Sequence, residues 1–476
     1  MTFYLLLILE ILLSAAAVSH ALLHKRDSRA ALGWVAVSVV FPYIGPLLYY
    51  VFGINRIRTR AQRLGLRSQL RIEAPGFQPV GKEPPTGKPL SVPEAMMAIA
   101  RVSDTVTGAP LLPGNSLEML CNGEQAYPAM MKAIKDARHR IFLTTYIFET
   151  NRTGRYFIDA LAAAAARGVD VRVMLDGVGE IYSLPRAGSL LSRRGVAVAR
   201  FLPPRIYPPT LHINLRNHRK LMAVDGCVGF IGGMNIGDRH LVTNRARTRN
   251  PVRDVQFKVI GPVIRQLEQC FAEDWRFCTG QGVDLSPPCH ENAGGSMCRA
   301  IVEGPNEDLD KLSSILGGAI GAARQRIAVM TPYFLPPRGL IGALQTAALR
   351  GVKVDVVLPV HSNLFYVDWA TRNMLWEILK WGGQVYLQPA PFAHTKLFLV
   401  DGTYAQVGSA NIDPRSLRLN FELNLEVFDP VFAGHIEGFI DKAIAASSPL
   451  TAEALDRRPL PAKLRDAAVW LFAPYL

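Results

Sequence analysis

Hydrophobic and polar residues follow the same order twice along the central part of this chain. Each round predicts a helix, a buried strand, a second helix and a second strand. The ranges are 130–138, 140–148, 156–167 and 169–175 in the first round, and 312–323, 326–334, 340–350 and 352–358 in the second. Alternating strands and helices indicate an α/β fold in which helices flank a mixed β-sheet, and the doubling indicates two similar lobes.

Two long apolar segments precede the repeats. Residues 3–23 carry one charge, Glu10, and residues 30–53 carry none, so each is long enough to cross a hydrocarbon core of about 30 Å. The segment between them holds three Lys or Arg residues, and a denser basic cluster follows the second: Arg56, Arg58, Arg60, Arg63, Arg67 and Arg71. Because basic clusters stay in the cytoplasm, residues 1–73 are predicted to form a two-helix transmembrane hairpin with the rest of the chain on the cytoplasmic side.

Two alternatives concern this N-terminal region. The small residues 14–17 resemble a signal-peptide cleavage site, but no basic stretch precedes the first apolar segment and a second one follows it. Pro42, Gly45 and Pro46 also leave open whether the second segment crosses fully or re-enters.

The remaining boundaries come from composition. Residues 74–115 are rich in Pro and Gly, with one helical stretch over 93–102, and are interpreted as a linker. The first lobe is predicted over 116–298 and the second over 299–450. The tail, 451–476, places basic residues beside Leu, Val, Trp and Phe, which is typical of a helix lying on anionic lipid or of a terminal helix docked on the second lobe.

The amino-acid composition excludes some classes of protein. The 476 residues have a net charge of +14, yet 49% are hydrophobic and only 19% charged, which excludes a disordered polyelectrolyte. Many arginines flank the apolar segments and no base-reading motif is present, so no nucleic acid partner is expected. The six cysteines lack metal-ligand spacing and are interpreted as free thiols in a reducing compartment; no metal and no cofactor is predicted.

Each half carries one further match, a polar motif of identical spacing. His218, Lys220 and Asp225 lead to Asn235 in the first, just as His394, Lys396 and Asp401 lead to Asn411 in the second. Lysine follows histidine by two positions, aspartate by seven and asparagine by seventeen in both copies. Alternation places each His and Lys on one face of a strand, and packing alone does not require the same polar set twice.

Such a pair of motifs fits phosphodiester chemistry. A neutral imidazole can attack phosphorus and carry the phosphoryl group, while a protonated imidazole gives its proton to the leaving alkoxide. Lysines and asparagine amides can stabilise negative charge on the phosphate oxygens. Histidine is suited to both duties because its ordinary pKa is about 6.5.

The duplicated HxKxxxxD pattern resembles the phospholipase D superfamily and, within it, the bacterial cardiolipin synthases. The resemblance extends to Thr144-Thr145-Tyr146-Ile147-Phe148, Thr331-Pro332-Tyr333-Phe334 and Gly408-Ser409-Ala410-Asn411. It implies one active site formed by both lobes, with His218 and His394 facing phosphorus and Lys220, Lys396, Asn235 and Asn411 on its oxygens.

The resemblance also implies roles for four carboxylates. Asp225 and Asp401 are expected to be structural, whereas Glu422 and Asp254 are the candidates for orienting the histidines. The family pattern implies His218 as nucleophile and His394 as acid, although the near-symmetric motifs give little reason from sequence for that choice.

The reaction implied is phosphatidyl transfer between two phosphatidylglycerol molecules, giving cardiolipin and glycerol through a phosphohistidine. Anionic phospholipids and the bilayer are the expected partners, and the resemblance implies a multi-pass protein of a bacterial inner membrane. Hydrolysis of phospholipid or nucleic acid by the same residues is the first alternative, and a non-catalytic membrane scaffold is the second. The acceptor alcohol and any homo-oligomeric state stay open.

Overall fold

A computed structural model describes residues 2–25, 28–53, 94–204, 215–243, 248, 250–287, 289, 292–304 and 310–473. The chain divides into two compact units, Met1–Arg67 and Ser68–Leu476, and each is described by itself. The predicted basic cluster from Arg56 to Arg71 and the first part of the linker lie outside the described residues.

The N-terminal unit contains one helix, α1 (Thr2–His24), that is long and apolar enough to span a membrane. The second apolar segment is broken into α2 (Ser28–Val40), α3 (Ile44–Leu48) and a π-helical turn, η1 (Tyr49–Gly53). The 13 residues of α2 extend only about 20 Å. The prediction of a second continuous span over 30–53 is therefore not confirmed.

The break after α2 has a local cause. A proline disfavours helical geometry in the residue before it, and Pro42 follows Phe41 directly after the end of α2. Tyr43 then adopts a positive φ of 59°, and a Cβ on Gly45 would lie 2.1 Å from the Val37 carbonyl oxygen. The chain thus folds back closely, and the Tyr43 hydroxyl donates to the Leu6 carbonyl oxygen of α1 at 2.6 Å.

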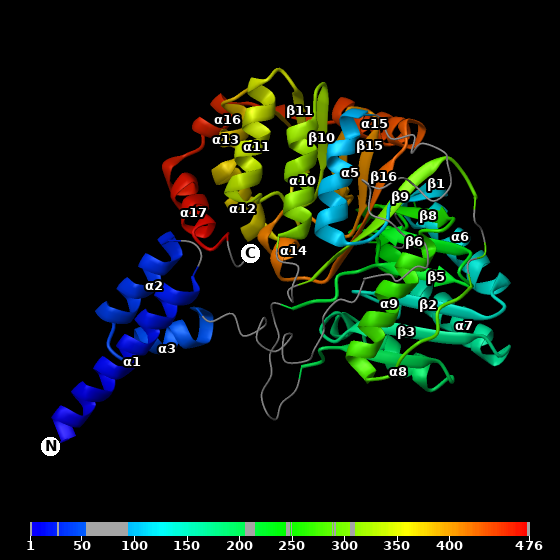
Figure 1. The fold of residues 1–476 in the computed structure, drawn as a ribbon, viewed down its shortest axis with the longest axis horizontal. Helices are drawn as coiled ribbons and strands as arrows, with labels where there is room; N and C mark the ends of the chain where they lie inside the picture. The colour runs from blue at the N-terminus through cyan, green and yellow to red at the C-terminus, as the bar shows by residue number, and fades with distance from the viewer. Residues whose placement is uncertain are drawn as a thin grey trace. The chain divides into compact units, whose positions relative to one another are not determined.

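The second unit is built on one 15-stranded sheet (Figure 1). Its strand order is β17-β12-β11-β10-β14-β15-β16-β9-β1-β8-β6-β5-β2-β3-β4, and β13 pairs with β7 separately. The strands are β1 (Leu112–Cys121), β2 (Arg140–Thr145), β3 (Asp170–Asp176), β4 (Ala197–Phe201), β5 (Leu221–Val224), β6 (Val228–Gly232), β7 (Val252–Arg253), β8 (Val255–Ile260), β9 (Ser296–Glu303), β10 (Arg326–Met330), β11 (Lys353–Pro359), β12 (Gln384–Gln388), β13 (Phe392–Ala393), β14 (Leu397–Val400), β15 (Tyr404–Gly408), β16 (Glu422–Phe428) and β17 (Ser448–Leu450).

Helices flank this sheet, as the alternation predicts. They are α5 (Glu94–Thr107), α6 (Asn122–Asp136), α7 (Arg152–Ala166), α8 (Ala187–Ser192), α9 (Ile264–Thr279), α10 (Lys311–Ala322), α11 (Arg338–Leu349), α12 (Phe365–Met374), α13 (Trp376–Leu379), α14 (Pro414–Arg418), α15 (Pro430–Ala445), α16 (Ala452–Asp456) and α17 (Leu460–Trp470), with short 3-10 turns η2 (Gly179–Tyr182) and η3 (Asp238–His240).

The two lobes repeat one arrangement. Strands β2, β3 and β4 pair in parallel and β5, β6 and β8 follow antiparallel in the first lobe, just as β10, β11, β12 and then β14, β15, β16 do in the second. At the seam, β1 pairs antiparallel with β9 in an irregular register. The α/β class with two similar lobes is confirmed, and the sheet runs through both.

The helix α5 belongs to the second lobe, although it precedes the first in sequence. Figure 1 shows α5 beside α10 over the second lobe's strands. Met96 and Ile99 are buried in that lobe's core, and Ser103 donates to Glu426 on β16 at 2.8 Å. The linker interpretation of 74–115 therefore does not extend to this helix, because its apolar face is part of a core.

Two cysteines form a disulfide, which corrects the interpretation of all six as free thiols. Cys227 and Cys289 are bonded, while Cys121, Cys270, Cys278 and Cys298 are free. The two bonded cysteines are 62 positions apart, so spacing alone gave no signal that the fold brings them together.

The aspartate of each motif closes a turn at the end of the motif strand. Asp225 adopts a φ of 53° and accepts three backbone N–H bonds, from Arg138, His139 and Arg140, at 2.7–2.8 Å. Asp401, at φ 50°, accepts three from residues 324–326, all at 2.8 Å. These carboxylates tie the motif strand to the start of its neighbour, which matches the structural role expected for them.

Asp225→Ala is expected to lower the free energy of unfolding by about 2 kcal/mol, since three bonds to a charged acceptor are lost and alanine tolerates positive φ poorly. Asp225→Asn is the matched control, because its amide oxygen still accepts and asparagine enters this backbone region readily. Urea unfolding of the full chain in detergent measures both. Equal stability of the alanine variant and the wild type would contradict the structural role.

Candidate active site

The two histidine segments each cross to the opposite lobe. Asn217 bridges to Phe421, and the His218 backbone N–H donates to the Phe421 carbonyl oxygen at 2.9 Å. Across the pseudo-twofold axis, β13 pairs in parallel with β7, and the His394 N–H donates to the Arg253 carbonyl oxygen at 2.7 Å. Backbone pairing between the lobes therefore fixes the backbone position of both histidines.

The carboxylates that hold the histidines are also exchanged between lobes. His218 Nδ1 lies 3.0 Å from Glu422 Oε2 of the second lobe, and His394 Nδ1 lies 2.9 Å from Asp254 Oδ2 of the first. Both carboxylates are about 1% exposed. Each Nδ1 is thereby engaged, which directs the other ring nitrogen, Nε2, away from the carboxylate and leaves it for chemistry.

The two imidazoles face one shared space. Their ring centroids are 6.5 Å apart and their planes are inclined by 78°. At this centroid separation one phosphate group bound between the rings can contact both of them. The single active site implied by the family resemblance therefore has a geometric basis.

The lysines lie beside their own histidines. Lys220 Nζ donates to the His218 carbonyl oxygen at 2.6 Å, and Lys396 Nζ lies 2.9 Å from His394 Nδ1. Burial lowers the pKa of Lys220 to about 7 and that of Lys396 to about 8. A bound phosphate anion would raise the pKa of both lysines, so both amines would then carry a positive charge beside it.

Burial also sets the state of the imidazoles and their carboxylates. It lowers the pKa of His218, and burial together with Lys396 lowers that of His394 well below its ordinary value. The carboxylates differ: burial raises the pKa of Asp254, whereas for Glu422 the charges of His218 and Lys220 outweigh burial and lower it. At neutral pH Glu422 is thus the more firmly ionised partner.

The asparagines are buried near the motifs but hold different partners. Asn235 Oδ1 accepts from the Ile147 backbone N–H at 3.1 Å, whereas the Asn411 amide donates to Ser416 Oγ at 3.2 Å. Asn411 and Lys396 line the same small internal cavity of the second lobe. Asp225 and Asp401 do not join this set, because their carboxylates bind the turns described above.

Two tyrosines complete the surroundings without having been assigned a role from sequence. The Tyr146 ring lies 5.3 Å from that of His218 and 5.6 Å from Lys220 Nζ, while the Tyr333 ring lies 6.4 Å from that of His394. Both occupy the third place of matching Thr-containing tripeptides, which was the available signal. Ser409 Oγ also donates to Glu422, at 2.6 Å.

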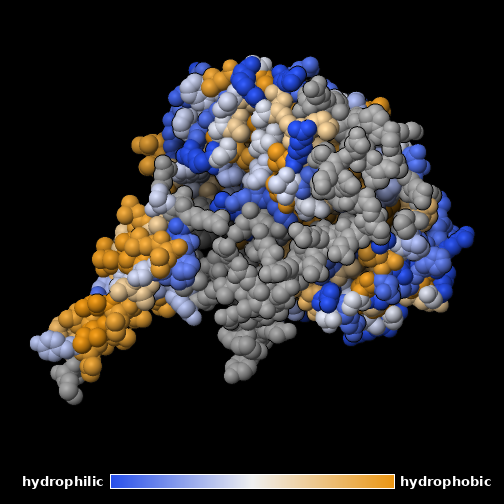
Figure 2. Space-filling view, viewed as in Figure 1, coloured by the Kyte–Doolittle hydropathy of each residue, from blue (hydrophilic) through white to orange (hydrophobic). Residues whose placement is uncertain are grey.

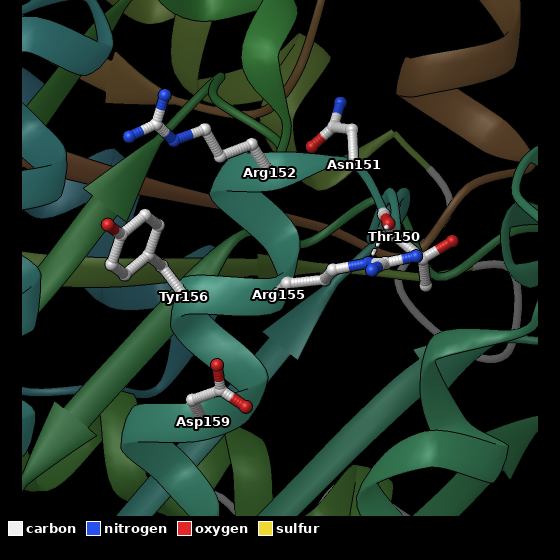
Figure 3. Close-up of a pocket in the computed structure, with 6 residues that line it drawn as sticks. All are labelled: Thr150, Asn151, Arg152, Arg155, Tyr156 and Asp159. Atoms are coloured by element: carbon white, nitrogen blue, oxygen red, sulfur yellow. Dashed lines mark hydrogen bonds between the residues drawn. The ribbon is translucent and has the colours of Figure 1, made fainter.

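A separate surface hollow lies at the start of α7 and holds none of the motif residues (Figure 3). Its lining residues are Thr150, Asn151, Arg152, Arg155, Tyr156 and Asp159. Arg155 points toward the Thr150 backbone and donates to its carbonyl oxygen at 3.2 Å. The chemistry-bearing groups converge between the lobes instead.

Comparison with known proteins identifies related families and proteins. The family described as cardiolipin synthase, phospholipase D-like domain, matches residues 130–275 and 316–444, and the phospholipase D-nuclease N-terminal family matches 11–53. Cardiolipin synthase A of Pseudomonas putida is 32% identical over 93% of this chain and 92% of its own length. Cardiolipin synthase A of Pseudomonas aeruginosa is 33% identical over 94% of this chain and 90% of its own.

The chain belongs to the cardiolipin synthase family. Its fold is also that of phosphatidylserine synthase from Haemophilus influenzae, with a TM-score of 0.62 and 15% identity over 79% of this chain and all of that one. The family is one of membrane phosphatidyltransferases in the phospholipase D superfamily, and the apolar helix α1 fits a membrane protein.

A pH profile follows from the lysines of this family's motif. Both ammonium groups carry charge below their pKa values, about 7 for Lys220 and about 8 for Lys396, and lose it as the pH rises through them. The rate of cardiolipin formation is therefore expected to fall on the alkaline side above pH 7–8. Lys220 has the lower pKa and sets this limb, so Lys220→Arg should move it upward from about pH 7 toward about 8, because guanidinium stays charged. Lys396→Arg should leave the limb in place, and both variants should lower the maximal rate. Initial rates in mixed micelles test this, and an unmoved limb in Lys220→Arg would refute it.

Proposed function

We propose that this chain makes cardiolipin by moving a phosphatidyl group from one phosphatidylglycerol to the terminal hydroxyl of another, through a phosphohistidine. The observation that carries the proposal is the pair of imidazoles 6.5 Å apart, each held through Nδ1 by a buried carboxylate of the opposite lobe. Such a pair can divide nucleophile and acid duties at one phosphorus.

In the first half-reaction His218 is the nucleophile. Ionised Glu422 holds the Nδ1–H, so neutral Nε2 presents its lone pair to phosphorus. A phosphodiester anion bound between Lys220 and Lys396 raises the pKa of His394 toward its ordinary value, so that ring can carry a proton. The new N–P bond forms as the P–O bond to glycerol breaks, and His394 gives its proton to the leaving glycerol oxygen.

In the second half-reaction the roles of His394 reverse. Its neutral ring takes the proton from the terminal hydroxyl of a second phosphatidylglycerol, whose oxygen attacks phosphorus. The N–P bond breaks, cardiolipin leaves, and His394 is again protonated. Lys220, Lys396, Asn235 and Asn411 stabilise charge on the phosphate oxygens in both steps.

The decisive experiment supplies phosphatidylglycerol alone to the purified full chain in mixed micelles made with ¹⁸O-labelled water. Mass spectrometry is expected to find unlabelled cardiolipin and glycerol. His218→Ala should give no product, whereas His139→Ala, which changes an exposed histidine outside the site, should match the wild type. Phosphatidic acid carrying ¹⁸O would assign hydrolysis instead, and undiminished biological activity of a His218→Ala or His394→Ala variant that forms no product would assign a scaffold role.

For the membrane topology we propose residues 1–73 as a hairpin anchor and the lobes on the cytoplasmic side. The positive-inside bias supports this side; the Cys227–Cys289 disulfide weighs toward an oxidising one. A cysteine introduced at Lys132, whose side chain is 78% exposed, decides between them. In intact spheroplasts a membrane-impermeant maleimide should leave it unlabelled, and labelling before lysis would place the lobes outside the cytoplasm.

A further inference from the structure

The C-terminal helix α17 reverses the usual arrangement of a surface helix, because its carboxylate faces the protein and its leucines face outward. Its one acidic residue, Asp466, is fully buried and paired with Arg458 and Arg465. Leu460 and Leu464 are instead 68% and 62% exposed. Burying a carboxylate is costly unless it is paired, so the charge cluster fixes which face of α17 turns inward.

The outward face is a continuous apolar stripe. Leu460, Leu464, Ala468 and Leu471 follow one another at intervals of three or four residues, which places them on one side of a helix. Leu471 and the adjoining Phe472 are 70% and 62% exposed. Single exposed leucines are ordinary, but an unbroken stripe of them marks an interaction surface.

The helix that carries the stripe packs on α12. Figure 1 shows α17 beside α12, and the two helices are in extensive contact. The Arg465 guanidinium carbon lies 4.1 Å from the centre of the Trp369 ring, which in turn packs 4.8 Å from Phe365, itself 60% exposed.

Phe365, the first residue of α12, follows Asn363 by two positions, and Asn363 contacts a tyrosine of the active site. The Tyr333 hydroxyl donates to Asn363 Oδ1 at 2.7 Å, and the Tyr333 ring lies beside His394. A series of contacts thus links the α17 stripe, through Trp369, Phe365 and Asn363, to the tyrosine beside His394.

Charge favours one occupant for the stripe. Arg457 and Lys463 are basic residues in and directly before α17, and the charge of Asp466 is already balanced by Arg458 and Arg465. An apolar stripe bordered by basic side chains matches the acyl and headgroup boundary of an anionic bilayer. The chain also contains α1, a helix long and apolar enough to span a membrane.

We propose that the outward face of α17, together with Phe365, inserts into the surface of an anionic bilayer and brings phosphatidylglycerol from that surface to the site. The insertion itself is independent of the proposed reaction; only the identity of the delivered lipid rests on it. The second lobe is then held against the leaflet that contains the substrate.

The direct test is a depth measurement on the full chain in proteoliposomes of phosphatidylglycerol and phosphatidylethanolamine. Spin labels on Leu464→Cys and Leu471→Cys are expected to collide with dissolved oxygen at least five times more often, relative to an aqueous nickel complex, than a label on Val431→Cys. Val431 is the matched control, since it is 71% exposed and lies on α15 of the same lobe. Labelled wild type corrects for the native cysteines.

The kinetic test separates surface binding from chemistry. Leu464→Glu with Leu471→Glu should raise the KM for vesicle phosphatidylglycerol about five- to ten-fold and leave kcat/KM for a short-chain, monomeric phosphatidylglycerol unchanged. Val431→Glu should alter neither value, and unchanged thermal midpoints confirm that the exposed substitutions leave the fold intact.

Two outcomes would overturn the inference. Equal aqueous accessibility at 464 and 431 would show that the stripe is not inserted. Disulfide cross-linking of Leu464→Cys between two chains, with protection from both lipid and water probes, would assign the stripe to a second copy. If the labels insert but neither substrate yields cardiolipin, the proposed reaction fails while the membrane contact stands.

Discussion

Replacing Glu422 with glutamine is expected to lower the maximal rate of cardiolipin formation by about 1,000-fold without loss of the folded state. A glutamine amide can occupy the same space, but it cannot hold the Nδ1–H of His218 with a negative charge or stabilise the positive charge that develops on that ring. Its NH₂ group also conflicts with Ser409 or Asn420, both of which now donate to the carboxylate.

The pH profile separates this loss from a merely structural one. The Glu422 charge raises the pKa of His218 against the lowering effect of burial, so its removal lowers that pKa further. The acid limb of the rate profile should therefore move to lower pH in Glu422→Gln while the maximal rate falls. Glu453→Gln, the same change on exposed α16, is the control. A Glu422→Gln variant with wild-type rate and an unmoved limb would remove the carboxylate from the proposed mechanism.

The exchange of carboxylates couples catalysis to lobe assembly. His218 and Glu422 are 204 positions apart in sequence, and His394 and Asp254 are 140 apart. A lobe on its own would hold a histidine and a carboxylate that belong to different pairs. The shared sheet, with β1 and β9 joined at the seam, keeps both pairs in register.

Local patterns predicted much of this arrangement. The repeated strand and helix order located both lobes because each element buries an apolar face at its own period. The identical spacing singled out His218, Lys220, His394 and Lys396, which the structure brings together. Glu422 and Asp254 entered only through the family resemblance, since a single buried carboxylate on a strand has no periodic signature.

The features that sequence missed depend on distant contacts. α5 has an amphipathic pattern, but nothing local shows that its partner is α10, more than 200 residues later. The Cys227–Cys289 bond joins residues 62 positions apart, so nothing near either cysteine in the sequence identifies its partner. The break after Val40 was visible as Pro42, Gly45 and Pro46, yet uniform hydrophobicity across it still favoured one continuous span.

The near-symmetric site leaves one asymmetry with a mechanistic consequence. Glu422 is held ionised by His218 and Lys220, whereas burial raises the pKa of Asp254, and Lys396 Nζ lies 2.9 Å from His394 Nδ1. A firmly ionised partner accepts the Nδ1–H of His218, which leaves the lone pair on Nε2 of the neutral ring and makes that nitrogen a stronger nucleophile. A neighbouring ammonium makes protonated His394 a stronger acid, which suits proton donation to the leaving group.

This asymmetry predicts opposite behaviour of the two alanine variants with an activated substrate, phosphatidyl-p-nitrophenol. Its leaving group departs as a stable anion and needs no proton, so His394→Ala should release one equivalent of nitrophenolate in a burst and then stall. Without a base to activate the acceptor, phosphatidyl-His218 should accumulate, with turnover reduced by about 100-fold or more. His218→Ala should give no burst, because it lacks the attacking nitrogen.

Peptide mass spectrometry after acid-free quenching identifies the modified ring. Phosphatidyl attached to His218 in the His394→Ala protein would assign the nucleophile, and His139→Ala should behave as wild type. A burst in His218→Ala with the label on His394 would reverse the assignment, and it would mean that the proximity of Lys396 matters more than the ionisation of Glu422. A burst in neither variant would exclude a covalent intermediate on either ring, because the activated substrate removes the need for the acid.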